Sequence, residues 1–387
     1  MKKIIIFGST GSIGTSLLNI IKKNKKDFTI ELLTANKNYK KLIKQAKYFN
    51  VKNLIITDQN SFLKAIKIIS NKNINIYKNF ASFNKIFKNK KVDYTMSAIT
   101  GLQGLKPTLD IIKFTKVIAI ANKESIICGW NLIKKDLKKY KTKFIPVDSE
   151  HFSIWSLIKN DKYTNFEKIY LTASGGPFRN LPLNKFGSIT PYKALKHPNW
   201  SMGKKISIDS ATMMNKVFEV IEAKKIFDFK YNQLEILIHP QSYLHAIVKF
   251  NNGLTKLLVH DTSMIIPIFN SLYQKKNHKI KSNNLNFEIL NNLELKKVNS
   301  IRYPLIKIIN KLTNNDSLFE TIIVSANDCL VNKFLNKEIN FTDISKKLLY
   351  ILNLKEFKKF SKIRPNTVEQ IEKLANYVSL KVSSISI

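Results

Sequence analysis

A strand, a glycine turn and a helix follow one another at the start of the chain, and this order limits the fold more than any other feature. Residues 3–7 are apolar, the segment GSTGSIG occupies 8–14, and residues 15–24 have the apolar spacing of a helix. Dinucleotide-binding folds use such a turn, because its glycines let the backbone approach a pyrophosphate at the N-terminus of the helix. The spacing, with Gly8, Gly11 and Gly14, is looser than the usual G-x-G-x-x-G. Glycines kept only for packing are the alternative.

Further strand-like runs alternate with helical stretches in the first 150 residues. They lie at 28–38, 53–57, 92–99 and 116–122. This alternation predicts an α/β fold with a doubly wound, Rossmann-like parallel sheet. Ligands of such sheets gather at the carboxyl ends of the strands. In ANKES (121–125) we therefore expect Asn122, Lys123 and Glu124 to face a cofactor or substrate, with a plain polar turn as the alternative.

The end of the second strand bears on the choice of cofactor. Lys37 and Asn38 stand where NAD-dependent enzymes usually carry an acid for the ribose 2′-hydroxyl. A cation at this place prefers a 2′-phosphate, so the sequence predicts NADPH. One more surface lysine is the alternative.

Two acidic residues stand close together in PVDSE (146–150), between an apolar strand and a helical pattern. Asp148 and Glu150 are two apart, and in an extended segment such side chains face the same way. Carboxylates that close repel each other unless a cation neutralises them. Oxygen ligands without a His/Cys cluster favour Mg²⁺ or Mn²⁺ over zinc. The alternative is an ordinary acidic helix N-terminus.

Two later segments extend this hypothesis. Residues 168–180 are predicted to be a strand that runs into a Ser-Gly-Gly-Pro turn, a shape suited to an anion. Residues 205–227 are predicted to be a strand, a polar turn and a long helix. On that helix Lys216, Glu219 and Glu222 share one face, which also fits a surface ion-pair ladder. The functional interpretation is a third metal carboxylate, Glu219, beside a phosphate site made by Ser210, Asn215 and Lys216.

Composition excludes several classes of protein. A chain of 387 residues with 44% hydrophobic residues predicts two or three globular domains. No apolar run approaches the roughly 18 residues that span a bilayer, and the first strand begins too near Met1 for a leader. Cys128 and Cys329 are too few for a disulfide framework, which fits a cytoplasmic protein.

The net charge of +38 invites a nucleic-acid partner. Lysine is spread along the whole chain with asparagine and isoleucine, which share AT-rich codons, and no nucleic-acid motif is present. We therefore expect a solvated basic surface that steers anionic substrates, and no nucleic-acid partner.

Seven segments together resemble the 1-deoxy-D-xylulose 5-phosphate reductoisomerase family. They are GSTGSIG, ANKES, PVDSEH, SGGPFR, HPNWSMG, DSATMMNK and HPQS, in the family's order and within residues 1–250. The resemblance implies a homodimer that uses NADPH and a divalent metal. It also implies rearrangement and reduction of the sugar phosphate to 2-C-methyl-D-erythritol 4-phosphate, in isoprenoid precursor biosynthesis.

The resemblance also implies roles for single residues. The metal ligands would be Asp148, Glu150 and Glu219, which with Lys123 form the catalytic group. The substrate contacts would be Lys123, Ser149, Glu150, Ser174, His197, Trp200, Ser210, Asn215, Lys216 and Glu219. The NADPH contacts would be Gly8, Thr10, Gly11, Ser12, Ile13, Asn36, Lys37, Asn38, Asn122, Glu124 and Gly203. HPNWSMG (197–203) would be a flap, within 195–205, that closes over the substrate with Trp200 as its cover.

Three places depart from the family pattern. Asn36 replaces a glycine beside the 2′-phosphate site, and Val217 and Phe218 replace Gly-Leu before the metal glutamate. The segment 259–268 has lost a glycine and a Pro-Asp-Met-Arg run. We expect Asn36 to cost little, because asparagine tolerates a left-handed backbone better than most residues. The bulk of Val217 and Phe218 bears on the reaction rate, and the change at 259–268 is interpreted as drift in a structural region, with weaker dimer contacts as the alternative.

The expected organisation has four parts. They are an NADPH-binding domain at 1–147, an α/β catalytic domain at 148–275, a linker at 276–300 and a C-terminal helical bundle at 301–387. Helical patterns in the last part lie at 303–313, 317–336, 342–352 and 366–380. A semialdehyde dehydrogenase, another NADPH enzyme of similar architecture, would need a catalytic Cys-His pair mid-chain, and neither cysteine has that context.

Overall fold

The computed structural model describes residues 1–387 except 70–72, 89, 160–164, 201, 274–277 and 385–387. The described chain divides into two compact units. The first contains Met1–Ser125, Asn131–Asp148 and Met264–Ile280, and the second contains Ile126–Trp130, Ser149–Ser263 and Lys281–Ile387.

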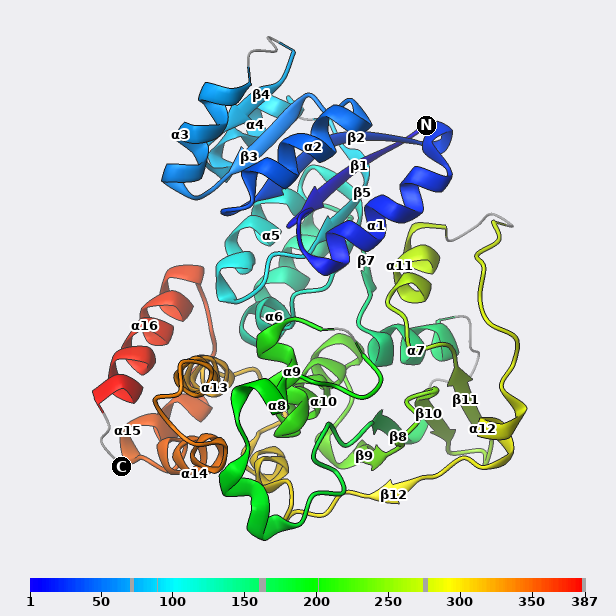
Figure 1. Ribbon diagram of the computed structural model, residues 1–387, viewed down its shortest axis with the longest axis vertical. Helices are drawn as coiled ribbons and strands as arrows, with labels where there is room; N and C mark the ends of the chain where they lie inside the picture. The colour runs from blue at the N-terminus through cyan, green and yellow to red at the C-terminus, as the bar shows by residue number, and fades with distance from the viewer. Residues whose placement is uncertain (70–72, 89, 160–164, 201, 274–277, 385–387) are drawn as a thin grey trace. The chain divides into compact units, whose positions relative to one another are not determined.

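A seven-stranded parallel sheet forms the centre of the first unit, in the order β4-β3-β2-β1-β5-β6-β7 (Figure 1). Its strands are β1 (Lys2–Phe7), β2 (Phe28–Ala35), β3 (Asn53–Ile56), β4 (Asn75–Tyr77), β5 (Val92–Ser97), β6 (Thr115–Ile120) and β7 (Lys143–Pro146). The strand order reverses beside β1, which is where doubly wound sheets bind ligands. The predicted doubly wound fold is therefore confirmed.

Helices cover this sheet because their apolar faces match its buried strands. They are α1 (Ser12–Lys23), α2 (Tyr39–Phe49), α3 (Gln59–Ile68), α4 (Phe83–Phe87), α5 (Leu105–Ile112), α6 (Lys123–Lys139) and α11 (Ile265–Leu272). Leu17 and Ile21 of α1 are buried in one core with Ile4 and Ile6 of β1. This packing fixes the start of α1, and with it the glycine turn, at the carboxyl end of β1.

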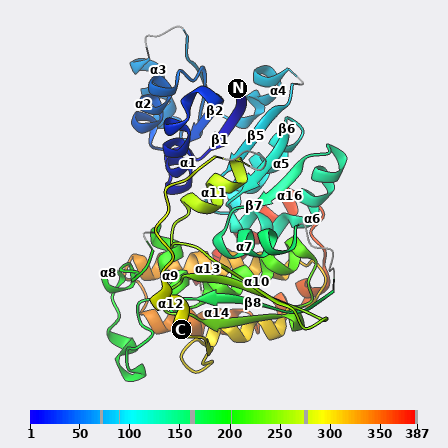
Figure 2. The ribbon, with the colours of Figure 1, turned by 90° about the vertical axis from the view of Figure 1, so that its right-hand side faces the viewer.

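The second unit is built on a mixed five-stranded sheet in the order β11-β10-β8-β9-β12. Figure 1 labels all five strands, and Figure 2 shows the sheet from another side, with β8 labelled. Its strands are β8 (Phe166–Ala173), β9 (Leu234–Ile238), β10 (Leu244–Phe250), β11 (Thr255–Val259) and β12 (Lys296–Lys297). The helices of the same part of the chain are α7 (Ser149–Ile158), α8 (Pro191–Ala194), α9 (Lys204–Ala211), α10 (Met214–Phe227) and α12 (Phe287–Asn291). Ile154 of α7, Val220 of α10 and Ile169 of β8 belong to one buried cluster, so the sheet supports α7 and α10.

The C-terminal helices pack around α13, and α13 packs against α9. These helices are α13 (Phe319–Leu335), α14 (Phe341–Ile351), α15 (Lys355–Lys358) and α16 (Val368–Ser384), and the predicted helix at 303–313 is a 3₁₀ segment, Pro304–Lys311. Asn327 of α13 donates to Asp209 of α9 at 2.8 Å. Lys225 of α10 pairs with Asp316 at 2.7 Å and with Glu320 of α13 at 3.2 Å. These buried polar contacts tie α13 to the two helices that carry the site described below.

The strand predicted at the start of 205–227 is wrong, because these residues form helix α9. Ile206 and Ile208 alternate with polar residues, but so short an alternation does not separate a strand from a helix. Gly203 begins the helix, Ser207 Oγ donates to its carbonyl at 3.1 Å, and the buried Asp209 has its partner on α13. The long helix predicted after the turn is confirmed as α10.

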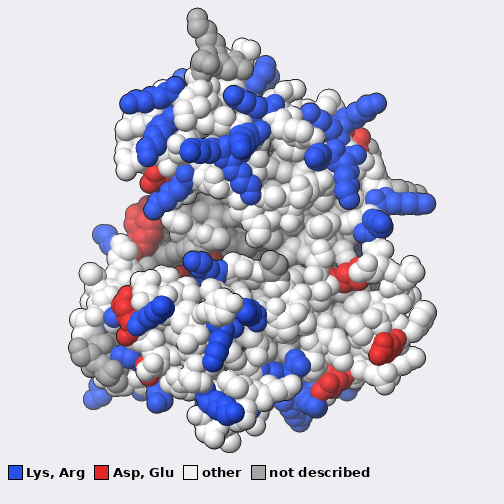
Figure 3. All heavy atoms as spheres, in the orientation of Figure 1, with Lys and Arg blue, Asp and Glu red and all other residues white. Residues whose placement is uncertain are grey.

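The chain is strongly basic, and Figure 3 shows lysine and arginine side chains scattered over the visible face, where they outnumber the acidic ones. Within the described part of the chain, no helix has the length and apolar character needed to cross a membrane.

Candidate active site

A buried lysine lies between two carboxylates at the centre of the second unit. Lys216 Nζ is 2.6 Å from Glu150 Oε1 and forms an even shorter ion pair with Glu219. The Lys216 side chain is 5% exposed and that of Glu219 is 1% exposed. Asn215 donates to the second oxygen of Glu219, and Ser149 Oγ donates to Glu150 Oε2 at 2.6 Å. The predicted face of α10 is therefore real, but it is not a surface ladder.

The turn between β7 and α7 places the acidic residues, and its backbone differs from the prediction. Ser149 opens helix α7, so Asp148 precedes the helix and Glu150 lies in its first turn. The two are therefore not neighbours on one extended face. Glu150 reaches the cluster because α7 packs against α10, and an acid in the first turn of a helix is favoured by the helix dipole.

Asp148 and Lys123 pair at the carboxyl ends of neighbouring strands. Lys123 begins α6, directly after β6, and its Nζ donates to Asp148 Oδ2. Both side chains are largely buried, at 12% and 21% exposure. ANKES is thus no plain polar turn, since Asn122 caps α6 through Ser125 N and is itself buried.

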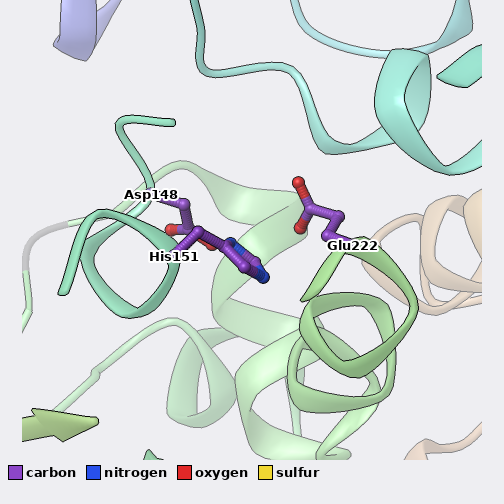
Figure 4. A group of neighbouring side chains, drawn as sticks. All are labelled: Asp148, His151 and Glu222. Carbon is purple, nitrogen blue, oxygen red and sulfur yellow. The ribbon is translucent and has the colours of Figure 1, made fainter. Parts of the chain in front are cut away.

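Two overlapping groups of side chains have the geometry of a cation site. Asp148, Glu150 and Glu219 offer oxygens within 4.8 Å of one another, and so do Asp148, His151 and Glu222 with one ring nitrogen. Asp148 immediately precedes Ser149, the first residue of α7, so it lies close to Glu150 and His151 in the chain. Figure 4 shows the second group, in which His151 and Asp148 approach from the α7 side and Glu222 from α10. The first group is the predicted metal triad, and its three carboxylates suit a hard divalent cation.

The charge balance at this cluster keeps Lys216 protonated. Burial by itself lowers the pKa of Lys216, but Glu150 and Glu219 outweigh it and the pKa is raised. An ammonium is therefore the counter-ion of two buried carboxylates here. A cation that takes these carboxylates as ligands needs Lys216 to move to another anion.

The Ser-Gly-Gly turn after β8 lies beside the end of α9. Gly176 has φ +67°, and a Cβ there would lie 2.9 Å from the carbonyl oxygen of Ser210. Only glycine fits such a close approach. Ser174 Oγ accepts from Gly176 N at 3.1 Å, a local contact within the predicted Ser-Gly-Gly-Pro turn. The turn thereby brings the hydroxyl of Ser174 toward the end of the helix that carries Ser210.

His197 organises the segment that is predicted to be the flap. Its Nδ1 accepts from the backbone N–H of Asn199 at 3.2 Å and of Trp200 at 3.0 Å, so the proton lies on Nε2, which donates to Ser174 Oγ at 3.1 Å. Burial lowers the pKa of His197 to about 4, so the ring is neutral near pH 7. Asn199 also donates to Pro240 O at 2.7 Å. Ser201, inside the predicted flap, lies outside the described residues.

Sequence reasoning missed two histidines beside the flap. His245 of β10 stacks on His260, with ring centroids 3.7 Å apart, and meets Trp200 edge-on at 6.2 Å. Burial and the neighbouring His260 lower the pKa of His245 to about 3. His245 could have been found from the sequence, because it lies just after the HPQS segment. His260 gave no such signal, because it lies in the segment 259–268 that departs from the family pattern.

The predicted cofactor turn lies at the carboxyl end of β1 in the first unit. Gly8 N donates to Thr34 Oγ1 of β2, and Gly11 N donates to Gly8 O, both at 3.0 Å. Gly8 has φ +67° and a Cβ there would lie 2.5 Å from Ala98 O, so its glycine is needed for packing. Gly11 and Ser12 are exposed at the start of α1, as are Asn36, Lys37 and Asn38 at the end of β2.

Thr10 and Ile13 are half-buried in the same turn, and Glu124 is buried in α6. Gly203, the remaining predicted cofactor residue, is exposed at the start of α9 in the second unit.

Three family models match this chain, and together they cover most of its length. Residues 4–129 match the 1-deoxy-D-xylulose 5-phosphate reductoisomerase model, residues 144–227 match the C-terminal domain model of the same enzyme, and residues 260–378 match the DXP reductoisomerase C-terminal domain.

Similar proteins and structures agree with the family models. The 1-deoxy-D-xylulose 5-phosphate reductoisomerase of Pelagibacter ubique (strain HTCC1062) is 69% identical over 100% of both chains, and that of Clostridium kluyveri is 36% identical over 99% of this chain and 100% of its own.

Among solved structures, the reductoisomerase from Zymomonas mobilis in complex with NADPH has a TM-score of 0.88 at 31% identity, over 99% of this chain and 98% of its own. A DOX-P reductoisomerase in complex with NADPH, fosmidomycin and magnesium has a TM-score of 0.90 at 29% identity, with the same coverage.

Proposed function

This chain belongs to the 1-deoxy-D-xylulose 5-phosphate reductoisomerase family and is an NADPH-dependent enzyme of that activity, and we propose which of its residues bind the metal, the substrate and the cofactor. The reaction rearranges the carbon skeleton of the ketose phosphate and reduces the product to 2-C-methyl-D-erythritol 4-phosphate. It is a step of non-mevalonate isoprenoid precursor biosynthesis.

Asp148, Glu150 and Glu219 would hold Mg²⁺ or Mn²⁺. Their oxygens converge within 4.8 Å, and the two glutamates already balance a positive charge, the ammonium of Lys216. When bound, the metal supplies Lewis acidity that stabilises negative charge on a substrate carbonyl or hydroxyl oxygen. Ser149 holds the second oxygen of Glu150 and Asn215 holds that of Glu219, so both carboxylates are oriented before a ligand arrives.

The substrate phosphate would bind to Ser174, Ser210, Asn215 and Lys216, with His197 at its edge. Ser174 lies at the end of β8 next to the turn that approaches Ser210, and Lys216 is on the helix after it. A phosphate gains charge-assisted hydrogen bonds from the ammonium. His197 joins Ser174 to the flap backbone, so phosphate binding at Ser174 is transmitted to Trp200 through one ring.

Lys123 would stabilise negative charge that develops on the substrate. Its ammonium is largely buried and is held by Asp148, one of the proposed metal ligands. Burial strengthens its electrostatic effect relative to a lysine in water. A closed flap with Trp200 as its cover would exclude water during the reduction.

NADPH would bind to the glycine turn and the end of β2. We assign the cofactor to residues 1–147, through Gly8, Thr10, Gly11, Ser12, Ile13, Asn36, Lys37, Asn38, Asn122 and Glu124, with Gly203 from the catalytic domain at 148–275. No side chain caps the N-terminus of α1, and its first turn carries no acidic residue. Its backbone N–H groups are therefore suited to a pyrophosphate.

The observation that carries this assignment is the buried pairing of Lys216 with Glu150 and Glu219. The test is NADPH absorbance with the ketose phosphate, with and without Mg²⁺, and with NADH in place of NADPH. We expect oxidation only when metal and ketose phosphate are both present, and a strong preference for NADPH. Turnover that is unchanged in a chelator would refute the metal assignment.

We also propose a cytoplasmic homodimer. The edge of the second sheet exposes Leu254 and Leu257 of the β11 hairpin, at 47% and 46%, and the nearby segment exposes Leu285 and Phe287, at 58% and 65%. Asn283 N donates to Asp261 Oδ2 at 3.0 Å, so this segment lies beside the chain that follows β11. An apolar surface of this kind fits a second copy of the chain.

Light scattering should give a particle mass of twice the chain mass, and Phe287→Glu should lower that mass. Neither Cys128 nor Cys329 forms a disulfide in the described part of the chain, which fits a reducing compartment.

A further inference from the structure

Lys41 holds the glycine turn from the neighbouring helix. It lies in the first turn of α2, which begins after β2, and its Nζ donates to Thr10 O at 2.9 Å and to Thr15 Oγ1 at 2.9 Å. Thr10 belongs to the turn and Thr15 to the first turn of α1. One ammonium therefore joins three elements that meet at the carboxyl edge of the sheet: the turn after β1, the start of α1 and the start of α2.

The partners of this ammonium are neutral. A backbone carbonyl and a hydroxyl accept its hydrogen bonds, and among the described residues no carboxylate forms an ion pair with it. The first turns of α1 and α2 carry no acidic residue either. Lys41 is half-buried and held in place, unlike the exposed lysines around it. A fixed positive charge that the protein leaves uncompensated favours an anionic ligand.

The position of Lys41 indicates which anion. The ribose 2′ group of a dinucleotide binds at the end of the second strand of such a sheet, next to the glycine turn. Lys37 and Asn38 are at the end of β2, and Asn38 caps α2 by accepting from Lys41 N at 3.2 Å. The two bonds of the ammonium use two of its three donors, so one N–H remains for a ligand.

We propose that Lys41 is a second cation of the 2′-phosphate site and a determinant of the preference for NADPH over NADH. This inference rests on the NADPH binding proposed above and adds a residue to it. Lys37 is exposed, whereas Lys41 is already held by two hydrogen bonds, so Lys41 contributes with a smaller loss of side-chain entropy.

Gln45 provides the matched control. It lies one turn further along α2 on the same face, and it holds the same turn through Ser9: Gln45 Nε2 donates to Ser9 O at 2.9 Å and Ser9 Oγ donates to Gln45 Oε1 at 2.8 Å. Gln45 thus positions the turn without a charge. If Lys41 only positions the turn, the two residues should behave alike.

The experiment measures dissociation constants of NADPH and NADH by quenching of protein fluorescence, for the parent, Lys41→Met, Lys41→Arg and Gln45→Met. We expect Lys41→Met to weaken NADPH binding by about tenfold or more, the scale of one hydrogen bond to a charged group, with little change for NADH. Lys41→Arg should retain most of the preference for NADPH. Gln45→Met should weaken both nucleotides by a similar factor.

Two results would overturn the proposal, and both can be distinguished from the result that would refute the proposed cofactor. Equal losses of NADPH and NADH affinity in Lys41→Met would make Lys41 a positioning residue of the turn only. Unchanged affinity for both would remove it from the site. A parent chain that binds neither nucleotide would refute the proposed cofactor, and this inference with it. Unfolding temperatures of all four proteins show whether a loss reflects a damaged fold.

Discussion

Removal of the Lys216 ammonium should tighten metal binding. Lys216 is bonded to Glu150 Oε1 at 2.6 Å and to Glu219, and these are two of the three proposed metal ligands. The metal and the ammonium therefore compete for the same oxygens. Lys216→Met keeps most of the side-chain volume and removes the competitor, so metal affinity should rise in the absence of substrate.

The size of the effect follows from the contacts. Two unit charges about 4 Å apart interact by about 4 kcal/mol at an effective dielectric constant near 20. Reorganisation and water that enters the emptied site offset part of this, so we expect a net gain of about 1.4–2.8 kcal/mol, or about 10- to 100-fold in affinity. The metal-free variant should also be less stable by about 3–5 kcal/mol, because two buried carboxylates lose their ion pairs with Lys216.

Mn²⁺ binding can be followed without turnover, by the electron paramagnetic resonance signal of the free ion. In the parent, methylphosphonate should strengthen Mn²⁺ binding, because an anion that attracts Lys216 releases the carboxylates. In Lys216→Met this coupling should vanish. The same variant should cost kcat/KM by about 2–4 kcal/mol with the phosphorylated ketose, and far less with a substrate that lacks the phosphate.

Lys225 is a matched control on the same helix. It is also buried and paired with two acids, Asp316 and Glu320, but away from the proposed metal ligands. Lys225→Met should destabilise the fold to a similar extent and leave Mn²⁺ affinity near that of the parent. If Lys216→Met binds Mn²⁺ no more tightly than the parent does, the ammonium and the metal do not share these carboxylates. In that case the two ion pairs of Lys216 do not control metal binding.

Two further outcomes follow from the site. Glu150→Gln should nearly abolish turnover while NADPH affinity is unchanged, because it removes a proposed metal ligand and leaves the glycine turn intact. Activity within a few-fold of the parent, measured by NADPH absorbance, would contradict the assignment. His245 has its pKa lowered from 6.5 to about 3 by burial and by His260, so between these values the unfolded chain binds a proton that the folded chain does not. The free energy of unfolding should therefore fall as the pH drops from about 6.5 toward 3. Urea unfolding at several pH values should show a shallower pH dependence of this free energy in His245→Asn than in the parent. Equal pH dependence in the two proteins would contradict this prediction.

The N-terminal sheet could be predicted from sequence because its signals are local. Each strand is a short apolar run with a turn after it, and the glycine turn marks the switch point beside β1. The same kind of local pattern gave a wrong prediction at 205–209, where two isoleucines at alternate positions fit a strand and a helix equally well. The deciding contact is Asp209 with Asn327, 118 residues further along, and no local pattern contains it.

The candidate site, too, was predicted only as far as local sequence patterns reach. That Asp148 and Glu150 belong together was predicted, although for a wrong backbone: Glu150 reaches the cluster from a helix, not from a strand. Lys41 was missed because, beside Lys37 and Lys40, it looks like one more surface lysine. Only the contacts with Thr10 and Thr15, across three elements, distinguish it.

Lys216 shows why burial decides between two interpretations of one pattern. Spaced three apart on a helix, Lys216 and Glu219 predict either a surface pair of small value or part of a site. The spacing is the same in both cases, and so is the attraction in water. The structure places both side chains at 5% exposure or less and adds Glu150 from 66 residues away. In that setting neither acid can lose the ammonium without another cation, and the ammonium cannot leave without another anion. A substrate that brings a phosphate to the protein, together with a divalent metal, supplies both replacements at once. A phosphate ester alone or a metal alone supplies only one, so each should bind more weakly by itself than in the presence of the other.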